Sequence, residues 1–498
     1  KAHGGRLPVS IKAVAEGTVV PAKNVLMTIE NTDPKCYWLT NYLETLLVQV
    51  WYPMTVCSQC VYERQWLTMT NGFFNPNSLC DFGFRGVSSV ESAGIGDAAY
   101  MAAGFMAPDT VVGVETARRF YHEPEKIGEY GTSVPASEHS TMTSWCDMSK
   151  TDKTAFAKDE RDAFVNMLHE YKNNPVVAIV IDGYNMWHVI RDQLLHDDML
   201  KAMEDFFGTA LPEGVDAPKL IVLRPDSGDG GLVLPEIAEL LTESFIGASV
   251  RMNAYTHLSK LAESMQNRTM RAENPKFKMG YGFAILQGDS VDLPRLPYYL
   301  AAIENAGYKP SEFAFGSGGG MLQKLDRDTL SCAFKCSLMM APQASQGKPE
   351  AMPLKWREIY KRPIDDKGKI SKQGFLRLAN IGGTVVTVRQ QKETGEDGKV
   401  QYHSFDENFR PTRSEDKAGE NLIDTIVFQH GRLLEDHSLA SIRGKVETAV
   451  ANKFQIDLSE YGRFKRELAK KVNAMEPEQL TVRARADLQT NHWVDSPQ

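Results

Sequence analysis

Four apolar runs in this sequence each end in polar or glycine residues that could line one ligand site, and the glycines of the last run could bind a phosphate. These residues are Asp182, then Arg224 and Asp226, then Gly288 and Asp289, and finally Ser317, Gly318 and Gly319. Carboxylates accept hydrogen bonds from hydroxyl groups, and backbone amides freed of side chains can converge on an anion. Taken singly, each position is better explained as a helix cap or a tight turn. Four such endings in series favour a binding site.

A histidine lies in the run from Ser133 to Thr141, where a strand-like stretch delivers His139 to the start of a predicted helix. A lone histidine is more often a surface residue or a hydrogen-bonded core residue. Glu138 precedes it, and carboxylates at strand ends could orient its ring. His139 could then serve as a nucleophile or a general base.

The elements that must position these residues alternate between strand and helix from residue 80 onward. Candidate strands cover residues 82–86, 110–114, 132–137, 176–182, 219–223, 282–287 and 312–316. Helical periodicity fills the intervening segments, for instance 159–171 and 235–245. This alternation predicts an α/β fold with a mainly parallel sheet, as a closed or nearly closed barrel, with a doubly wound open sheet as the alternative. In either fold the carboxyl ends of the strands meet at one edge, where ligands bind.

The flanking segments predict a second domain. Residues 9–29 alternate as short strands, residues 38–50 have helical spacing that ends before Pro53, and residues 56–71 predict a further helix. Cys57 and Cys60 are then core residues one helical turn apart. We predict that residues 1–80 belong to a β-rich and helical accessory domain and that residues 81–345 form the barrel. Residues 346–450 return to the accessory domain and contain a solvated insertion at 388–420, and residues 451–498 form a charged tail.

Composition excludes several classes of protein. The chain has 498 residues, 42% of them hydrophobic and 24% charged, with a net charge of -8, which indicates two or three globular domains and neither nucleic-acid nor acidic-membrane partners. Its seven cysteines are scattered, without a second CxxC pair to complete a zinc site, which favours reduced thiols and a cytoplasmic location. No apolar run reaches membrane-spanning length.

Five separated motifs together resemble the nicotinamide phosphoribosyltransferases, a family of type II phosphoribosyltransferases. They are Asp81–Ser89, Glu138–Thr141, Arg224–Gly228, Gln287–Asp289 and Phe315–Lys324. The resemblance implies an irregular, mainly parallel α/β barrel with a β-rich domain, and a homodimer with shared active sites. It also implies transfer of phosphoribosyl from phosphoribosyl pyrophosphate to nicotinamide, giving nicotinamide mononucleotide and pyrophosphate in NAD salvage. Mg²⁺ would accompany the pyrophosphate, and ATP hydrolysis would be coupled through a phosphohistidine.

The resemblance assigns roles to individual residues. His139 would be phosphorylated, Asp182 would orient it, and Asp226 would pair with ribose hydroxyls. Phe82 would stack on the pyridine ring. Asp109 would accept a hydrogen bond from the carboxamide and would repel the carboxylate of nicotinate.

Further residues would surround the rest of the substrate. Those near the amide, the sugar and its 5′-phosphate would be Arg85, Arg224, Gly288, Asp289, Ser317, Gly318 and Gly319. Cations reaching the phosphates from a partner subunit would be Arg327, Lys335, Lys361 and Lys369. Without the resemblance, the basic stretch that contains Lys361 and Lys369 is explained as a solvated face. We expect no metal ligands among the side chains.

The sequence also departs from the family pattern. Family members carry an N-terminal segment with an Asp-Ser-Tyr-Lys motif, and no counterpart to it is found here. Cys80, Phe84 and Ala333 stand where the family has histidine, tyrosine and serine. Two alternatives therefore stay open, which are a nicotinate phosphoribosyltransferase and a non-catalytic relative that lacks the N-terminal half-site.

Overall fold

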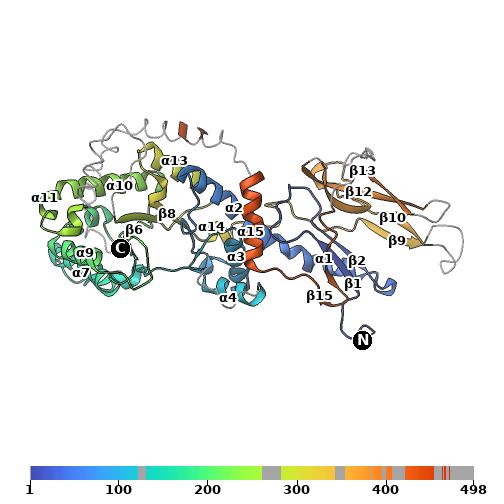
Figure 1. Ribbon diagram of the computed structural model, residues 1–498, viewed down its shortest axis with the longest axis horizontal. Helices are drawn as coiled ribbons and strands as arrows, with labels where there is room; N and C mark the ends of the chain where they lie inside the picture. Colours follow the sequence, from blue (N-terminus) through green and yellow to red (C-terminus); the bar gives the residue numbers. More distant parts are fainter. Residues whose placement is uncertain are drawn as a thin grey trace. The chain divides into compact units, whose positions relative to one another are not determined.

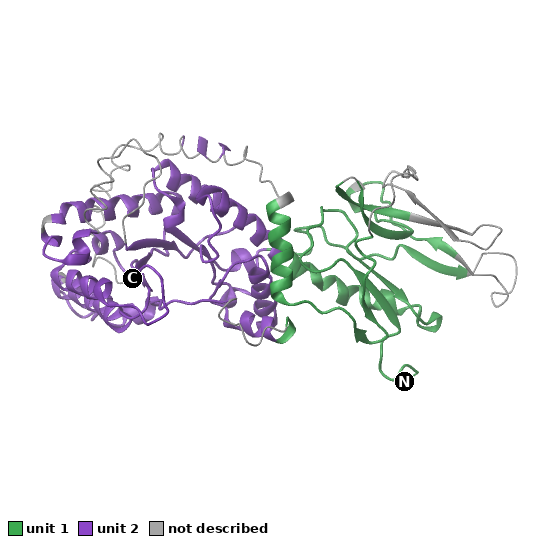
Figure 2. Ribbon diagram, viewed as in Figure 1, with its two compact units in different colours: residues 1–55, 119–123, 325–453 green, residues 56–118, 124–324, 454–498 purple. Residues whose placement is uncertain are grey.

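The computed structural model describes residues 2–121, 131–260, 282–342, 354–381, 383–394, 400–405 and 421–453, together with 462, 463, 465, 466 and 470. Two compact units divide the chain (Figure 2). Unit 1 comprises Lys1–Thr55, Arg119–Glu123 and Leu325–Lys453, and unit 2 comprises Val56–Arg118, Pro124–Lys324 and Phe454–Gln498. Each unit is described by itself.

A six-stranded sheet forms the centre of unit 2, in the order β4-β3-β8-β7-β6-β5. Its strands are β3 (Leu79–Asp81), β4 (Ala107–Pro108), β5 (Val176–Val180), β6 (Leu220–Arg224), β7 (Phe283–Gln287) and β8 (Phe313–Ser317). Every pairing in this sheet is parallel. The predicted α/β fold with a mainly parallel sheet is therefore confirmed.

The strands of this sheet are buried because helices cover it (Figure 1). The longer helices of unit 2 are α3 (Val90–Ala102), α7 (Lys153–Glu170), α9 (Asp197–Gly208), α10 (Gly230–Gly247) and α13 (Leu296–Asn305). In α10 the buried residues Leu234, Ile237 and Leu241 recur at helical spacing and face the core. Consecutive strands thus alternate with helices, as parallel pairing requires.

The sheet is an irregular, incomplete barrel rather than a closed one. Beyond β5 a single parallel bridge joins Ala136 to Ala178, and Ser137 secures it because its Oγ accepts from the Val180 amide at 2.8 Å. Among the described residues no strand pairing joins β4 back to β5. Ser137 therefore fixes the segment leading to His139 against the carboxyl half of β5.

Three predicted strands are wrong in position or type. Strand β3 ends at Asp81, before the predicted range 82–86, and residues 84–86 form the 3-10 helix η3 (Phe84–Gly86). Residues 111–114 begin helix α4 (Val111–Phe120), whose Gly113 and Ala117 are buried one turn apart, so packing overrides the β-branched valines. Residues 132–137 form the single bridge at Ala136. The strands predicted near 176, 219, 282 and 312 are confirmed.

Unit 1 is rich in antiparallel sheet, which confirms the predicted β-rich part. Strands β1 (Val9–Ala13), β2 (Met27–Asn31), β14 (Ile426–Gln429) and β15 (Arg432–Leu433) form one sheet, and β9 (Leu338–Pro342) pairs with β10 (Leu354–Glu358). Strands β11 (Phe375–Ile381), β12 (Thr384–Thr394) and β13 (Val400–Phe405) form another. The solvated loop predicted over 388–420 is therefore wrong for residues 388–394 and 400–405, which are in strands. Residues 395–399 and 406–420 lie outside the described ones.

Helices complete the two units. In α1 (Leu39–Leu47) the buried Leu39 and Leu43 pack with Val9 and Ile11. Helix α15 (Leu439–Lys453) ends the described part of unit 1. The predicted end of the first helix before Pro53 is confirmed, because α1 is followed by the 3-10 helix η2 (Val48–Val50) and stops there. The second helix, predicted over 56–71, begins earlier: α2 (Trp51–Asn71) has Pro53 in its first turn, where a proline loses no intrahelical hydrogen bond.

Two further predictions concern the helices and the tail. Cys57 and Cys60 lie one turn apart in α2, as predicted; Cys60 is buried and Cys57 is half-buried, and burial raises the pKa of the Cys57 thiol to about 12. No helix among the described residues combines the length and apolarity needed to cross a membrane. The helix predicted at 457–475 lies almost entirely outside the described residues.

Candidate active site

Phe82 forms the wall of the site where β3 ends beside β8. Its amide donates to the Ser317 carbonyl at 2.9 Å, so the backbone of Phe82 continues the β3–β8 ladder. Its ring lies so close to Gly316 that a Cβ there would be 2.1 Å from Cε2 of Phe82. The Arg224 guanidinium lies 5.7 Å from the centre of the same ring. Glycine at 316 is therefore what allows the ring to lie against the strand.

A pocket of about 440 Å³ opens beside this ring, and its lining residues are Phe82, Phe84, Arg85, Asp109 and Thr110. Asp109 follows β4, and its amide donates to the Asp81 carbonyl at 3.1 Å. Phe84 and Arg85 come from η3, which follows β3 directly. The pocket thus combines aromatic surface with one cation and one carboxylate. Such a lining suits a small, flat ring that bears a polar group.

His139 lies at the first position of the short helix α6 (His139–Thr143), whose N-cap is Glu138. The Glu138 carboxylate accepts from the Thr141 amide at 3.1 Å, and hydrogen bonds from the Ser140 and Thr141 backbone lower the pKa of Glu138. The His139 Nε2 lies 2.9 Å from Oδ1 of Asp182, which follows β5. The His139 side chain is 41% exposed, whereas that of Asp182 is 8% exposed.

This pair defines which ring nitrogen of His139 can react. A carboxylate is acceptor-only, so Nε2 carries a hydrogen and donates it in the hydrogen bond to Asp182, which favours that tautomer when the ring is neutral. The Nδ1 atom then carries the lone pair, and it lies 4.0 Å from Oδ2 of Asp226. The second oxygen of Asp182 accepts from the Asp226 amide at 3.1 Å, so one carboxylate fixes both residues. The arrangement can present a nucleophilic Nδ1 to an incoming electrophile.

Asp226 and Arg224 come from the end of β6. Burial raises the pKa of Asp226, and the neighbouring Arg224 opposes that rise. Arg224 donates to the Ser137 carbonyl at 2.8 Å, which anchors it to the segment before His139. Among the described residues, Oδ1 of Asp226 is buried and has no hydrogen-bond partner, and a Cβ at Gly288 would lie 2.2 Å from it. A buried carboxylate oxygen without a partner suits a ligand hydroxyl or a hard cation.

The glycine turn closes the same edge of the sheet at the end of β8. Ser317 donates its hydroxyl to the Val291 carbonyl at 2.8 Å, so it fixes the turn rather than pointing at a ligand. Helix α14 (Gly319–Leu322) begins just beyond, and a Cβ at Gly319 would meet no atom within 4 Å. Asp289 is exposed after β7, and Nε2 of the Gln287 side chain donates to the Asp289 backbone carbonyl at 3.0 Å. The predicted residues of unit 2 thus lie at the carboxyl ends of parallel strands.

The four predicted phosphate cations are in unit 1 and are all exposed. They are Arg327, Lys335, Lys361 and Lys369. Arg327 pairs with Asp328 at 2.7 Å, Lys335 pairs with Glu44, and Lys369 lies 3.5 Å from Asp366. These four residues belong to a different unit from the site described above, and their role stays a prediction.

The sequence did not predict the buried residues beneath the pocket. Asp81 and Asp97 are both fully buried, and burial raises the pKa of both carboxyl groups. Asp81 accepts from the Gly83 amide at 2.7 Å, which shapes the turn that follows Phe82. Ser137 was likewise missed. The signal for Asp97 was a charged residue within an otherwise small and apolar helix face, and for Ser137 it was a hydroxyl two residues before the histidine.

Comparisons with known proteins agree with the five motifs. The model of the nicotinate phosphoribosyltransferase (NAPRTase) family matches residues 77–403. The chain is 35% identical to a nicotinamide phosphoribosyltransferase of Xanthomonas campestris, over 90% of this chain and 80% of the relative. It is 28% identical to a nicotinamide phosphoribosyltransferase of Acinetobacter baylyi, over 81% and 73% of the two chains.

A solved structure also matches, though distantly. The nicotinate-nucleotide pyrophosphorylase of Pyrococcus furiosus has a TM-score of 0.43 and 16% identity, and the match covers 90% of this chain and 82% of that one. The assignment therefore rests on the family match, which covers well over half of the sequence, and on the relatives. The chain belongs to the nicotinate phosphoribosyltransferase (NAPRTase) family.

Proposed function

We propose that this chain transfers phosphoribosyl from phosphoribosyl pyrophosphate to nicotinamide, forming nicotinamide mononucleotide and pyrophosphate for NAD salvage. The observation that carries the proposal is the pocket lined by Phe82 and Asp109, in a chain whose relatives are named nicotinamide phosphoribosyltransferase. A cytoplasmic location, predicted from the scattered cysteines of the sequence, is part of this proposal.

Asp109 supports the amide rather than the acid as substrate. Its carboxylate can accept a hydrogen bond from the carboxamide NH₂, whereas the carboxylate of nicotinate would meet it as a like charge. Arg85 and Arg224 supply positive charge near the same ring and could compensate for that repulsion. Nicotinate is therefore the second candidate substrate, because the family model is named for it.

In the transfer, the pyridine nitrogen forms a bond to the anomeric carbon as the bond from that carbon to pyrophosphate breaks. Phe82 would orient the pyridine ring, and Asp226 would hold the ribose hydroxyls through its unpaired Oδ1. Amides at Gly318 and Gly319 would bind the 5′-phosphate. Mg²⁺, when bound with the pyrophosphate, would neutralise the charge that develops on the leaving group.

ATP would be coupled to the transfer through His139. Nδ1 would take the γ-phosphoryl group of ATP as the bond to the ADP oxygen breaks, and water would later release that group as phosphate. The 2.9 Å hydrogen bond from Nε2 to Asp182 supports this assignment because it leaves Nδ1 without a proton. Asp182 would also stabilise the positive charge that the ring acquires on phosphorylation.

A homodimer would complete the site with Arg327, Lys335, Lys361 and Lys369 of a second copy. Supporting evidence comes from an exposed apolar row on unit 1, at intervals of four residues. Trp38, Tyr42, Leu46 and Val50 are 53%, 74%, 65% and 51% exposed. Contiguous exposed apolar surface of this kind is typical of an interface between proteins. A second copy covering it would bury these side chains.

The substrate is tested by steady-state kinetics with nicotinamide and nicotinate in parallel. For Asp109→Ala we expect kcat/KM for nicotinamide to fall about 10- to 100-fold, the loss of one charge-assisted hydrogen bond, while turnover of nicotinate stays level or rises. Asp216→Ala, which removes an exposed loop carboxylate of the same unit, is the matched control and should leave both values unchanged. A parent enzyme that used nicotinate in preference to nicotinamide would overturn the proposal.

A further inference from the structure

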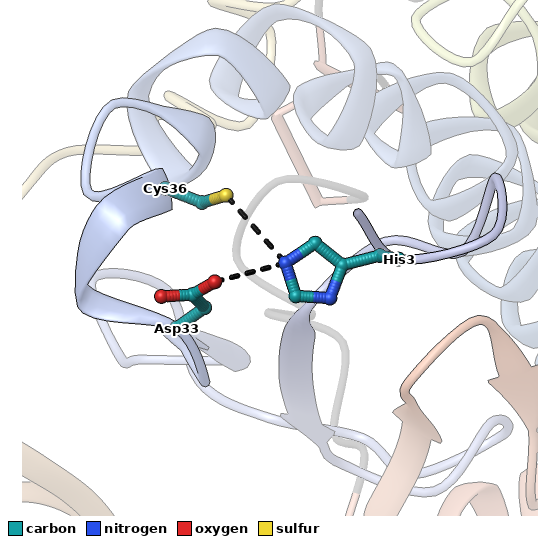
Figure 3. A group of neighbouring side chains, drawn as sticks. All are labelled: His3, Asp33 and Cys36. Carbon is teal, nitrogen blue, oxygen red and sulfur yellow. Dashed lines mark hydrogen bonds and ion pairs between the residues drawn. The ribbon is translucent and has the colours of Figure 1, made fainter. Parts of the chain in front are cut away.

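Three potential metal ligands meet on unit 1, outside the site described above. They are His3, Asp33 and Cys36, and their ligand atoms lie within 4.8 Å of one another (Figure 3). His3 precedes strand β1, whereas Asp33 and Cys36 belong to the turn after β2 that contains the 3-10 helix η1 (Pro34–Cys36). The cluster therefore joins segments 30 residues apart in sequence.

The geometry of the cluster distinguishes a metal site from a nucleophilic relay. Oδ2 of Asp33 lies 2.9 Å from Nε2 of His3, and Sγ of Cys36 lies 4.0 Å from that same nitrogen (Figure 3). In a cysteine–histidine–aspartate relay the ring must bridge its two partners through its two different nitrogens. Here the nitrogen, oxygen and sulfur atoms converge on one point, as ligands do around an ion.

The backbone holds two of these ligands in place without the ion. Oδ1 of Asp33 accepts from the Lys35 amide at 2.8 Å, which leaves Oδ2 facing His3. The Cys36 amide donates to the Asp33 carbonyl at 2.9 Å, and Asn31 donates to the Cys36 carbonyl at 2.6 Å. Such secondary hydrogen bonds orient metal ligands and reduce the cost of ordering them.

The other ligand also lies on a hydrogen-bonded turn. The Arg6 amide donates to the His3 carbonyl at 3.0 Å, and β1 then pairs with β2 along its whole length. The His3 side chain is 37% exposed and that of Asp33 is 26% exposed, so an ion could enter from solvent. Tetrahedral zinc would place the nitrogen and oxygen roughly 3.3 Å apart and the nitrogen and sulfur roughly 3.5 Å apart. Binding therefore requires the His3–Asp33 hydrogen bond, now 2.9 Å, to open slightly and Sγ of Cys36, now 4.0 Å from Nε2, to move inward.

We propose that His3, Asp33 and Cys36 bind one Zn²⁺ or a similar divalent transition metal. Imidazole, carboxylate and thiolate together are the donor set that zinc prefers, and a water molecule would complete the tetrahedron. Binding requires that the Cys36 thiol release its proton to solvent. The ion would tie the segment before β1 to the turn after β2 within unit 1.

Cobalt titration tests this proposal directly. The full chain, free of any affinity tag and stripped with a chelator, is titrated with Co²⁺ under reducing, anaerobic conditions. We expect one equivalent to produce a thiolate-to-cobalt band in the near ultraviolet together with visible bands of tetrahedral cobalt, and Zn²⁺ to bleach both. The thermal midpoint of unfolding should rise with the same equivalence.

Variants identify the ligands. Cys36→Ser should abolish the thiolate band, and His3→Ala should weaken cobalt binding by more than about tenfold. Cys336→Ser, which changes an exposed cysteine outside the cluster, should leave the spectrum unchanged. Absence of a thiolate band in the parent, or its persistence in a folded Cys36→Ser protein, would overturn the assignment. Circular dichroism of each variant establishes that it is folded.

Discussion

Replacing Gly316 by alanine should displace the ring that forms the wall of the pocket. The new Cβ would lie 2.1 Å from Cε2 of Phe82 and 2.3 Å from Cδ2, whereas ordinary contact begins at 3.4 Å. The ring or the strand must therefore move by roughly 1.3 Å, and a misplacement of about 1 Å costs on the order of 100-fold in rate. Overpacking of this kind also costs about 1–3 kcal/mol in the free energy of unfolding.

The assay is kcat/KM for nicotinamide at saturating phosphoribosyl pyrophosphate, with the thermal midpoint measured in parallel. We expect Gly316→Ala to lower kcat/KM about 100-fold. Gly247→Ala is the matched control, because a Cβ at that exposed glycine meets no atom within 4 Å, and it should behave as the parent.

A double-mutant cycle separates loss of the wall from general damage. In a Phe82→Ala background the ring is gone, so Gly316→Ala should cost little further activity. An equal loss in both backgrounds would refute the argument that Gly316 acts through the Phe82 ring. So would a Gly316→Ala enzyme that is folded and fully active.

Three other predictions concern stability and coupling. Glu63 is fully buried, and burial raises its pKa from 4.5 to about 8, so the charged form of Glu63 destabilises the fold. The free energy of unfolding is therefore highest below pH 4.5 and falls by about 1.4 kcal/mol per pH unit as the pH rises to 8. Glu63→Gln should therefore be the more stable protein at pH 9, by up to roughly 5 kcal/mol, and equal to the parent at pH 4, as measured by chemical unfolding; a difference independent of pH would contradict this. His139→Ala should abolish the ATP hydrolysis that accompanies synthesis, while slow, uncoupled synthesis remains. Asp182→Asn should reduce both this hydrolysis and the labelling of His139 by γ-³²P-ATP. Equal ATP hydrolysis in the His139→Ala variant and the parent would exclude His139 as the phosphorylated residue. Arg389→Met should lower the free energy of unfolding by about 2–3 kcal/mol, because it leaves the partly buried Glu358 without its paired guanidinium, and Arg389→Lys should recover only part of the loss.

The sequence predicted the barrel strands and the edge at which the polar residues lie, because both follow from local pattern. A short apolar run that ends in Asp182 or in Arg224 gives a parallel strand and its carboxyl end together. The same reasoning failed at residues 110–114, where β-branched valines belong to α4. Burial of Gly113 against Asp97 decides the outcome there, and no local pattern reveals that contact.

Long-range geometry accounts for the remaining differences. The charged hairpin of β12 and β13 lacks the apolar alternation of a half-buried strand, so its composition indicated a loop. His139 and Asp182 are 43 residues apart in sequence. The sequence suggested that a carboxylate at a strand end could orient the His139 ring, but several strand ends carry a carboxylate and local pattern does not select one of them. Likewise His3, Asp33 and Cys36 have no spacing typical of a metal motif, since their proximity depends on the pairing of β1 with β2.

Formation of nicotinamide mononucleotide tests the central claim most directly. The full chain is incubated with nicotinamide, phosphoribosyl pyrophosphate and Mg²⁺, with and without ATP, and the product is measured by chromatography. We predict that nicotinamide mononucleotide and pyrophosphate form in equal amounts, and that ATP increases the yield while ADP appears. Absence of the mononucleotide under both conditions, from a folded protein, would contradict the proposed function.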